Sequence, residues 1–167
     1  MARYCLDTSG LSNPLEYMPE DIHATLWQRI ASSVSSGVFA VTTEIYDELA
    51  LLRGPIGVCI NSHRDSLRFE VGDQKWNWQL YLDHTNRMLR DYRAYISEYN
   101  GNRKGTIGIN DMSIIALGRT PGLPVISMET LIREPQAKRQ RIPNICMMEN
   151  VQHLTFSDFL RMEGIKL

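Results

Sequence analysis

The sequence has little of several features that identify a protein class at once. Its 167 residues include only three cysteines, Cys5, Cys59 and Cys146, with no CxxC pair or Cys/His spacing of a zinc site. No hydrophobic run reaches the roughly 18 residues needed to cross a bilayer, and no signal-peptide stretch is present. We therefore expect a soluble cytoplasmic protein with reduced thiols and no membrane partner.

Net charge is nearly absent as well. The chain carries 18 Lys and Arg residues against 19 Asp and Glu residues, a formal net charge of −1. Contact with nucleic acid would therefore have to rest on local basic clusters. The composition, 43% apolar and 22% charged, excludes general disorder. No repeat, low-complexity segment or linker divides the chain, so we expect a single domain over residues 1–167.

Short apolar runs alternate with helical patterns along the chain. The runs at 4–6, 38–41 and 123–127 predict buried strands, and 142–148 is interpreted as a fourth. Turn residues follow the first run, at Gly10 and Asn13–Pro14. Helices are predicted from Asp21 to Gly37, over 44–54, along the apolar stripe 88–99, over 112–117 and over 156–164. This alternation predicts an α/β fold, a three-layer sandwich with a central, mostly parallel sheet.

Acidic residues fall where the strands of such a sheet end. Ligands bind beyond the carboxyl ends of parallel strands. Asp7 ends the first strand, Glu129 lies two residues past the third, and Asp111 opens a helix. On the helix after the second strand, a helical wheel places Glu48 at the border of the buried face. Glu44 lies further toward solvent, so Glu48 is the preferred fourth acid and Glu44 the reserve.

Four carboxylates at one sheet edge would repel one another unless a cation joined them. Mg²⁺ and Mn²⁺ take oxygen ligands, and one or two such ions can activate water for phosphodiester hydrolysis. Thr8 and Ser9 are candidates to hydrogen-bond Asp7 or a phosphate oxygen. Taken singly, each acid also fits an ordinary role as a turn, cap or surface residue. Only their joint placement favours a metal site.

The motifs that contain these acids resemble those of a known family. "YCLDTSGLSNP", "VTTEIYDELA" and "GINDMSIIALGR" followed by "LPVISMET" resemble the PIN domain, the fold of the VapC-like toxin ribonucleases of bacterial toxin–antitoxin pairs. The tail, with "RIPNICMMENV" and "FSDFLRMEGIKL", is similar to a PIN-like bacterial family of about this length. The resemblance implies a Rossmann-like sandwich, Mg²⁺- or Mn²⁺-dependent RNA cleavage, frequent homodimers and an antitoxin protein partner.

The resemblance also assigns roles by position. It implies that Asp7, Glu48, Asp111 and Glu129 are the catalytic, metal-binding acids, with Thr8 as the hydroxyl neighbour of the first. Many relatives have Asp at the fourth place, where this chain has Glu129. Separately, local basic clusters suggest RNA contacts at Arg103, Lys104, Lys138, Arg139 and Arg141, for which a solvated charge run is the alternative.

A phosphotransferase and a non-catalytic binding module are alternatives to a ribonuclease. Phosphotransferases of the haloacid-dehalogenase type also begin with a strand-end aspartate, but they need a second aspartate two residues later, where this chain has Ser9. A non-catalytic PIN-like module that binds RNA or protein stays open. The four histidines, His23, His63, His84 and His153, show no paired ligand spacing and are interpreted as structural or surface residues.

Overall fold

The strands form one parallel sheet at the centre of the molecule. A computed structural model describes residues 1–101, 106–134 and 138–166. The sheet has the order β2-β1-β3-β4, with β1 at Tyr4–Leu6, β2 at Phe39–Ala40, β3 at Val125–Ile126 and β4 at His153–Leu154. Tyr4 pairs with Phe39 and Cys5 with Val125, both in parallel register. The predicted α/β fold with a parallel central sheet is confirmed.

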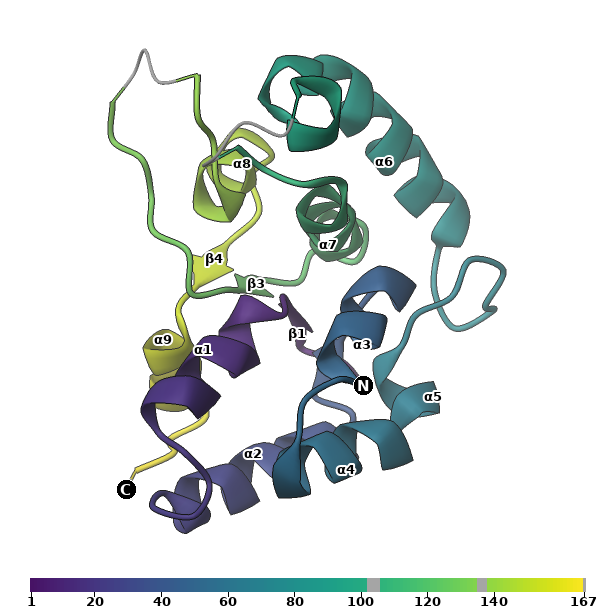
Figure 1. The fold of residues 1–167 in the computed structure, drawn as a ribbon. Coiled ribbons are helices and arrows are strands. Elements are labelled where there is room, and N and C mark those ends of the chain that lie inside the picture. The colour runs from purple at the N-terminus through teal and green to yellow at the C-terminus, as the bar shows by residue number, and fades with distance from the viewer. Residues whose placement is uncertain (102–105, 135–137, 167) are drawn as a thin grey trace.

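Helices connect the strands and cover both faces of the sheet. In Figure 1, α7 and α8 lie on one side, and α2 and α9 lie on the other. No helix in the described part of the chain is long and apolar enough to span a membrane. The helices are α1 Ser9–Tyr17, α2 Ala24–Ser35, α3 Thr43–Leu49, α4 Gly54–Ser62, α5 Arg64–Leu67, α6 Trp78–Asp91, the 3₁₀ turns η1 Arg93–Tyr95 and η2 Ser97–Tyr99, α7 Ile109–Arg119, α8 Ile142–Met148 and α9 Phe156–Met162.

The core has two halves, because successive residues of a strand point to opposite faces. Tyr4 of β1 packs edge-on against Phe159 of α9, with ring centroids 5.3 Å apart, and Phe159 also packs against Phe39. Cys5, the next residue, is fully buried and lies near Cys146 of α8. The short central strand therefore links the two layers of helices.

The first helix begins where a turn was predicted. A Cβ atom at Gly10 would meet the Leu6 side chain at 2.9 Å and the backbone oxygen of Ile126 at 3.0 Å. Gly10 therefore serves close packing of α1 on the sheet, and not a turn. Pro14 lies inside α1, where it removes only one hydrogen bond from a short helix. The predicted turn at Gly10 and Asn13–Pro14 is wrong for these reasons.

Two other helix boundaries differ from the prediction. The helix predicted from Asp21 starts at Ala24, and Ile22 stays 72% exposed outside it. The helix predicted over 44–54 ends at Leu49. Gly54, with φ of +83°, instead opens α4. Apolar residues at helical spacing extend beyond the start of α2 and the end of α3, so this spacing does not locate either boundary.

The segment 142–148 is a helix, so its interpretation as a fourth strand is wrong. A short apolar run fits either a buried strand or a buried helix, and Pro143 suits the first turn of a helix, where its missing N–H is not needed. Cys146 is buried, but in a helix. The actual fourth strand contains His153 and so has no apolar run to mark it. The stripe 88–99 is also interrupted, because α6 ends at Asp91 and two 3₁₀ turns follow.

Candidate functional site: the acidic edge of the sheet

Asp7 stands at the carboxyl end of the central strand. Its backbone N–H continues the pairing with β3 by donating to Ile126 O at 2.9 Å, and the residue is only 5% exposed. The side chain accepts from Ser9 N at 3.0 Å and from Ser9 Oγ at 2.5 Å, both at Oδ2. This local turn fixes the carboxylate at the start of α1. Asp7 is therefore both a turn residue and a carboxylate held at the sheet edge.

Glu48 reaches the same edge from α3. Thr42 caps this helix by accepting from Ile45 N, which sets the helix phase. The Glu48 carboxylate accepts a hydrogen bond from Thr8 Oγ1 and another from Asn110 Nδ2 at 2.9 Å. Thr8 therefore holds Glu48, whereas Ser9 holds Asp7. Both hydroxyl residues contact the candidate ligands.

Asp111 lies in the first turn of α7. Its Oδ2 accepts from the backbone N–H of Gly108 at 2.8 Å, which is one half of a capping box. The helix predicted over 112–117 is present but begins three residues earlier, at Ile109, so Asp111 is the third residue of the helix and the N-cap is Gly108. Glu98 of η2 also caps α7, by accepting from Ile109 N. The helix start therefore has two carboxylates.

Glu129 follows β3 on a loop that is tied to α8. Its Oε2 accepts from Ile142 N, the first residue of α8, at 2.7 Å. Its backbone N–H donates to Ser127 Oγ at 3.3 Å, and Ser127 Oγ is 2.8 Å from His153 Nε2. The neighbouring N–H, of Met128, donates to Ser9 Oγ at 3.1 Å. Glu129 is thus anchored beside Asp7 while its carboxylate caps a helix.

The four acids, which we call the acidic edge, affect one another electrostatically. Burial first, and then the charges of Asp7, Glu129 and Glu48, raise the pKa of Asp111 to about 7. Burial raises the pKa of Asp7 as well, and Glu129 and Glu48 add to this effect. Among the described residues, no Lys or Arg forms an ion pair with any of the four. Within the described parts of the chain, no ion pair therefore compensates the negative charge of the acidic edge.

The acidic edge fits a hard cation by chemistry but is not preformed for one. Within the described ranges, no group of three or more His, Cys, Asp or Glu side chains is placed to hold a metal ion as it stands. Each carboxylate faces a local donor, from Ser9, Thr8 and Asn110, Gly108 or Ile142. Carboxylate oxygens without competing cations are the ligands that Mg²⁺ and Mn²⁺ take. Holding such an ion would require these side chains to turn toward one another.

The predicted RNA-contacting residues fall in three situations. Lys138 and Arg139 are exposed, just before α8. Arg141 is half-buried and donates to Thr130 Oγ1 at 2.7 Å, so it also fastens the loop that carries Glu129. Arg103 and Lys104 lie outside the described residues. Of the five predicted residues, Lys138 and Arg139 are therefore the two that are described and exposed.

Sequence reasoning missed Asn110, Glu98 and the Ser127–His153 pair at this site. Asn110 directly precedes Asp111, so its place in the same helical turn was a signal that could have drawn attention to it. Glu98 and His153 come from distant segments, and nothing in their local sequence marks them. All of them position carboxylates or the backbone next to carboxylates. They form the hydrogen-bonded surroundings of the acidic edge.

Fold and site together define an α/β protein with a parallel sheet and a cluster of carboxylates beyond its strand ends. The chain belongs to the family described as "Domain of unknown function (DUF4411)", whose model matches residues 4–167. No curated protein matches the chain. Among solved structures, it is similar to a chain of "Crystal structure of DNA bound VapBC from Salmonella typhimurium", with 15% identity, a TM-score of 0.47, and coverage of 93% of this chain and 99% of that one. The family description states no activity, which leaves the acidic edge as the basis for a proposal.

Proposed function

We propose that this chain is a Mg²⁺- or Mn²⁺-dependent endoribonuclease that hydrolyses RNA phosphodiester bonds. The observation that carries the proposal is the gathering of Asp7, Glu48, Asp111 and Glu129 at one sheet edge, with no ion pair to any Lys or Arg that the structure describes. Like charges near a buried carboxylate such as Asp7 cost folding free energy, and such arrangements are typical of functional sites. A divalent cation is the ligand that this surplus of charge suits.

Each acid has a distinct place in the proposed site. Asp7 and Asp111 would hold the ion from a strand end and a helix start, which are rigid elements. Glu48 would join from α3, where Thr8 and Asn110 orient it. A bound Mg²⁺ or Mn²⁺ would supply activation of water and stabilisation of the leaving ribose 3′ oxygen. Glu129 would contribute from the loop before α8, within the limit set by its bond to Ile142.

The substrate class and partner follow from the sequence resemblance. PIN-like ribonucleases act on RNA, and Lys138 and Arg139 offer charge for its phosphates. The same resemblance supports a role as the toxin of a bacterial toxin–antitoxin pair, with an antitoxin protein as partner and a homodimer as the assembly. Expression of the chain alone should arrest growth, and Asp7→Asn should relieve the arrest. Arrest that persists with Asp7→Asn would contradict the toxin role.

A second candidate is a non-catalytic PIN-like module that binds RNA or protein. One observation favours it: among the described residues, the carboxylates are not placed as a ready group of metal ligands. In this alternative, the hydrogen bonds of Asp7, Asp111 and Glu129 would serve only to cap α1, α7 and α8. The two candidates differ in what they predict for cleavage and for metal binding.

A cleavage assay with matched variants distinguishes them. Single-stranded and structured RNAs are incubated with the wild-type chain in Mg²⁺, in Mn²⁺ and in chelator. Glu48→Gln is compared with Glu44→Gln, because both residues are exposed on α3 but only Glu48 contacts Thr8 and Asn110. We expect cleavage only with metal, loss in Glu48→Gln, and retention in Glu44→Gln. Equal cleavage by both variants would reject Glu48 as a ligand, and no cleavage or metal binding by the wild type would favour the binding module.

A further inference from the structure

A cavity lies at the end of the sheet opposite to the acids. It has a volume of about 360 Å³, within the usual range for small-molecule sites. Leu123 and Pro124, which precede β3, and Gln152, which precedes β4, line it together with Arg119 at the end of α7 and His84 of α6. Asp7 and Glu129 follow the carboxyl ends of β1 and β3, whereas the cavity lies before the amino ends of β3 and β4, so it is separate from the acidic edge. We call it the His84 cavity.

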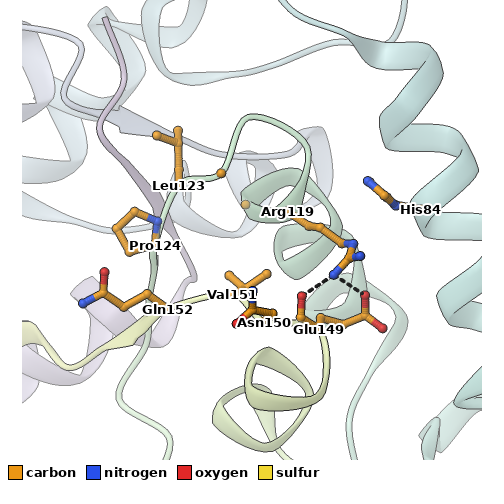
Figure 2. A pocket seen from close by; sticks show the side chains of 10 residues that line it. His84, Arg119, Leu123, Pro124, Glu149, Asn150, Val151 and Gln152 are labelled. Atoms are coloured by element: carbon orange, nitrogen blue, oxygen red, sulfur yellow. Dashed lines mark hydrogen bonds and ion pairs between the residues drawn. The ribbon is translucent and has the colours of Figure 1, made fainter.

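The two ends of the His84 cavity differ in character. Figure 2 shows Arg119 and His84 at one end, and Leu123, Pro124 and Gln152 at the other. The first end offers the N–H donors of Arg119 and His84 beside the Glu149 carboxylate, and the second offers apolar surface with one amide group. A ligand that is anionic at one end and apolar or flat at the other would match both.

The guanidinium of Arg119 is only partly used by the protein. Its Nη1 donates to the backbone oxygen of Glu149 and lies 3.1 Å from Glu149 Oε2. Arg87 binds the same carboxylate through two nitrogens, at 3.0 and 2.5 Å, and Tyr92 Oη donates to it at 2.6 Å. Glu149 is therefore already satisfied. Arg119 Nε, in contrast, is buried and has no hydrogen-bond partner within the described residues.

A buried donor without a partner costs free energy, so an acceptor at that place would stabilise the protein. A carboxylate ligand pairs best with both branches of a guanidinium fork, but Glu149 already occupies one branch of Arg119. Single donors from two separate side chains suit a tetrahedral phosphate group, which presents three oxygens. The arrangement of donors therefore favours a phosphate monoester.

We propose that the His84 cavity binds a small molecule of nucleoside size that carries one phosphate monoester. The phosphate lies against Arg119 and His84, and the body lies along Leu123 and Pro124 with its polar edge toward Gln152. The surroundings of Arg119 Nε must shift slightly to admit the phosphate, because that atom is buried. This site is independent of the nuclease proposal, since it shares no residue with the acidic edge.

His84 reports on such binding. Burial, and then Arg119 and Arg87, lower the pKa of His84, whereas Glu149 and Asp83 oppose them. A bound phosphate adds negative charge beside the imidazole and therefore raises this pKa. By linkage, a rise of about one unit means that the ligand binds about tenfold more tightly once His84 is protonated. The raised pKa of His84 is therefore the direct sign of binding, because the pH dependence of the affinity also includes the second ionisation of the phosphate, with a pKa of about 6.

The test follows the histidine ring resonances by NMR in chelator, without RNA or metal. Adenosine 5′-monophosphate is the probe, and adenosine and inorganic phosphate are the controls. We expect the nucleotide to shift the His84 signals and raise the His84 pKa, while the signals of His23, His63 and His153 stay in place. No shift at His84, equal shifts at all four histidines, or equal binding of adenosine would overturn the proposal. Equal binding of inorganic phosphate would overturn the nucleoside-sized body.

Calorimetry with variants gives a second readout. Arg119→Lys keeps the charge but removes Nε, and His84→Gln removes the imidazole. We expect at least about tenfold and at least about fivefold weaker nucleotide binding, respectively, in the range that loss of a charge-assisted hydrogen bond produces. His63→Gln, on the distant α4–α5 junction, should bind as the wild type does. Unchanged affinity in folded Arg119→Lys and His84→Gln would contradict the assignment.

Discussion

Glu149 and Asp111 are acids at opposite ends of the same helix layer, and their surroundings differ sharply. Glu149 is only 3% exposed, yet Arg87 and Tyr92 hydrogen-bond it and Arg87 and Arg119 supply charge, so its pKa is lowered even though burial opposes this. Asp111 is buried among other acids, so burial and then their charges raise its pKa to about 7, although the hydrogen bond from Gly108 N opposes the rise. One carboxylate is balanced within the protein, and the other is not.

This difference separates a structural carboxylate from a candidate functional one. Glu149 joins α6, α7 and α8, and its cations are part of the fold. The acidic edge stores repulsion that no described cation relieves. A metal ion would relieve it, and the same charge would then serve chemistry. Substitutions at the two places should therefore have opposite effects on stability and activity.

The largest expected effect on stability is at Glu149. Glu149→Gln leaves Arg87 and Arg119 without their shared carboxylate, and breaking a buried ion pair costs about 3–5 kcal/mol. Because these guanidiniums are 33% and 35% exposed, we expect about 3 kcal/mol, measured by urea denaturation. The control is Glu70→Gln, an exposed partner of Arg68, which should cost about 1 kcal/mol or less. Equal costs for the two variants would contradict the structural role of Glu149.

The acidic edge should behave in the opposite way. Asp7→Asn and Asp111→Asn should each reduce RNA cleavage by at least about a hundredfold, more than the loss of a residue that only orients a ligand. In chelator, both variants should be at least as stable as the wild type, because each removes a repelling charge. Cleavage rates test the predicted loss of activity, and urea denaturation curves test the predicted stability. Marked destabilisation together with wild-type cleavage would reverse the assignment of roles.

The pH dependence of stability sharpens the same comparison. The folded-state pKa of Asp111 is about 7, above its ordinary value of 3.8, so the folded protein binds this proton more tightly than the unfolded chain does. Stability in chelator should therefore fall as the pH rises from about 4 to 7, by at most about 1.4 kcal/mol per pH unit for one group. Denaturation across this range should show a smaller fall for Asp111→Asn. A fall of the same size in both proteins would contradict the raised pKa.

Asn110 tests whether the orientation of Glu48 matters. Asn110→Ala removes the 2.9 Å hydrogen bond to Glu48 and leaves Thr8 as its other donor. We expect about tenfold weaker cleavage, as for other residues that orient metal ligands, and a higher metal concentration for half-maximal rate. The control is Asn61→Ala on α4, whose amide bonds only backbone oxygens. A loss that metal concentration does not affect would indicate a structural role alone.

Substitution of Glu129 should have the smallest effect on stability, and it distinguishes a helix-capping role from a metal-binding role. Glu129→Gln can still accept from Ile142 N, whereas Glu129→Ala cannot. Loss of a cap costs about 1 kcal/mol, so only the alanine variant should be destabilised. If Glu129 also binds metal, both variants should bind Mn²⁺ more weakly. Wild-type metal affinity in the glutamine variant would assign Glu129 to capping α8 alone.

The sequence predicted the parts of this molecule that local patterns specify. Asp7 follows the first strand, as the apolar run that ends at Leu6 indicated. Glu48 contacts Thr8 from the helix after the second strand, on the side that the helical wheel indicated. The 142–148 helix was not predicted, because a short, mostly apolar run fits a strand equally well. The ties of Glu129 to α8 and of Glu149 to Arg87 join distant segments, and no local pattern encodes them. The metal-binding role of the acids remains a prediction.

The most direct test of the account is the effect of Mn²⁺ on thermal unfolding at pH 7.5. Ligand at about a hundred times its Kd stabilises a protein by about 2.7 kcal/mol, which is a rise in Tm of about 5 °C or more for a chain of this size. We predict that Mn²⁺ raises the Tm of the wild-type protein and of Glu44→Gln, that chelator reverses the rise, and that Asp7→Asn and Asp111→Asn show little or none. The same rise in the two asparagine variants, or none in the wild type, would contradict a metal site at the acidic edge.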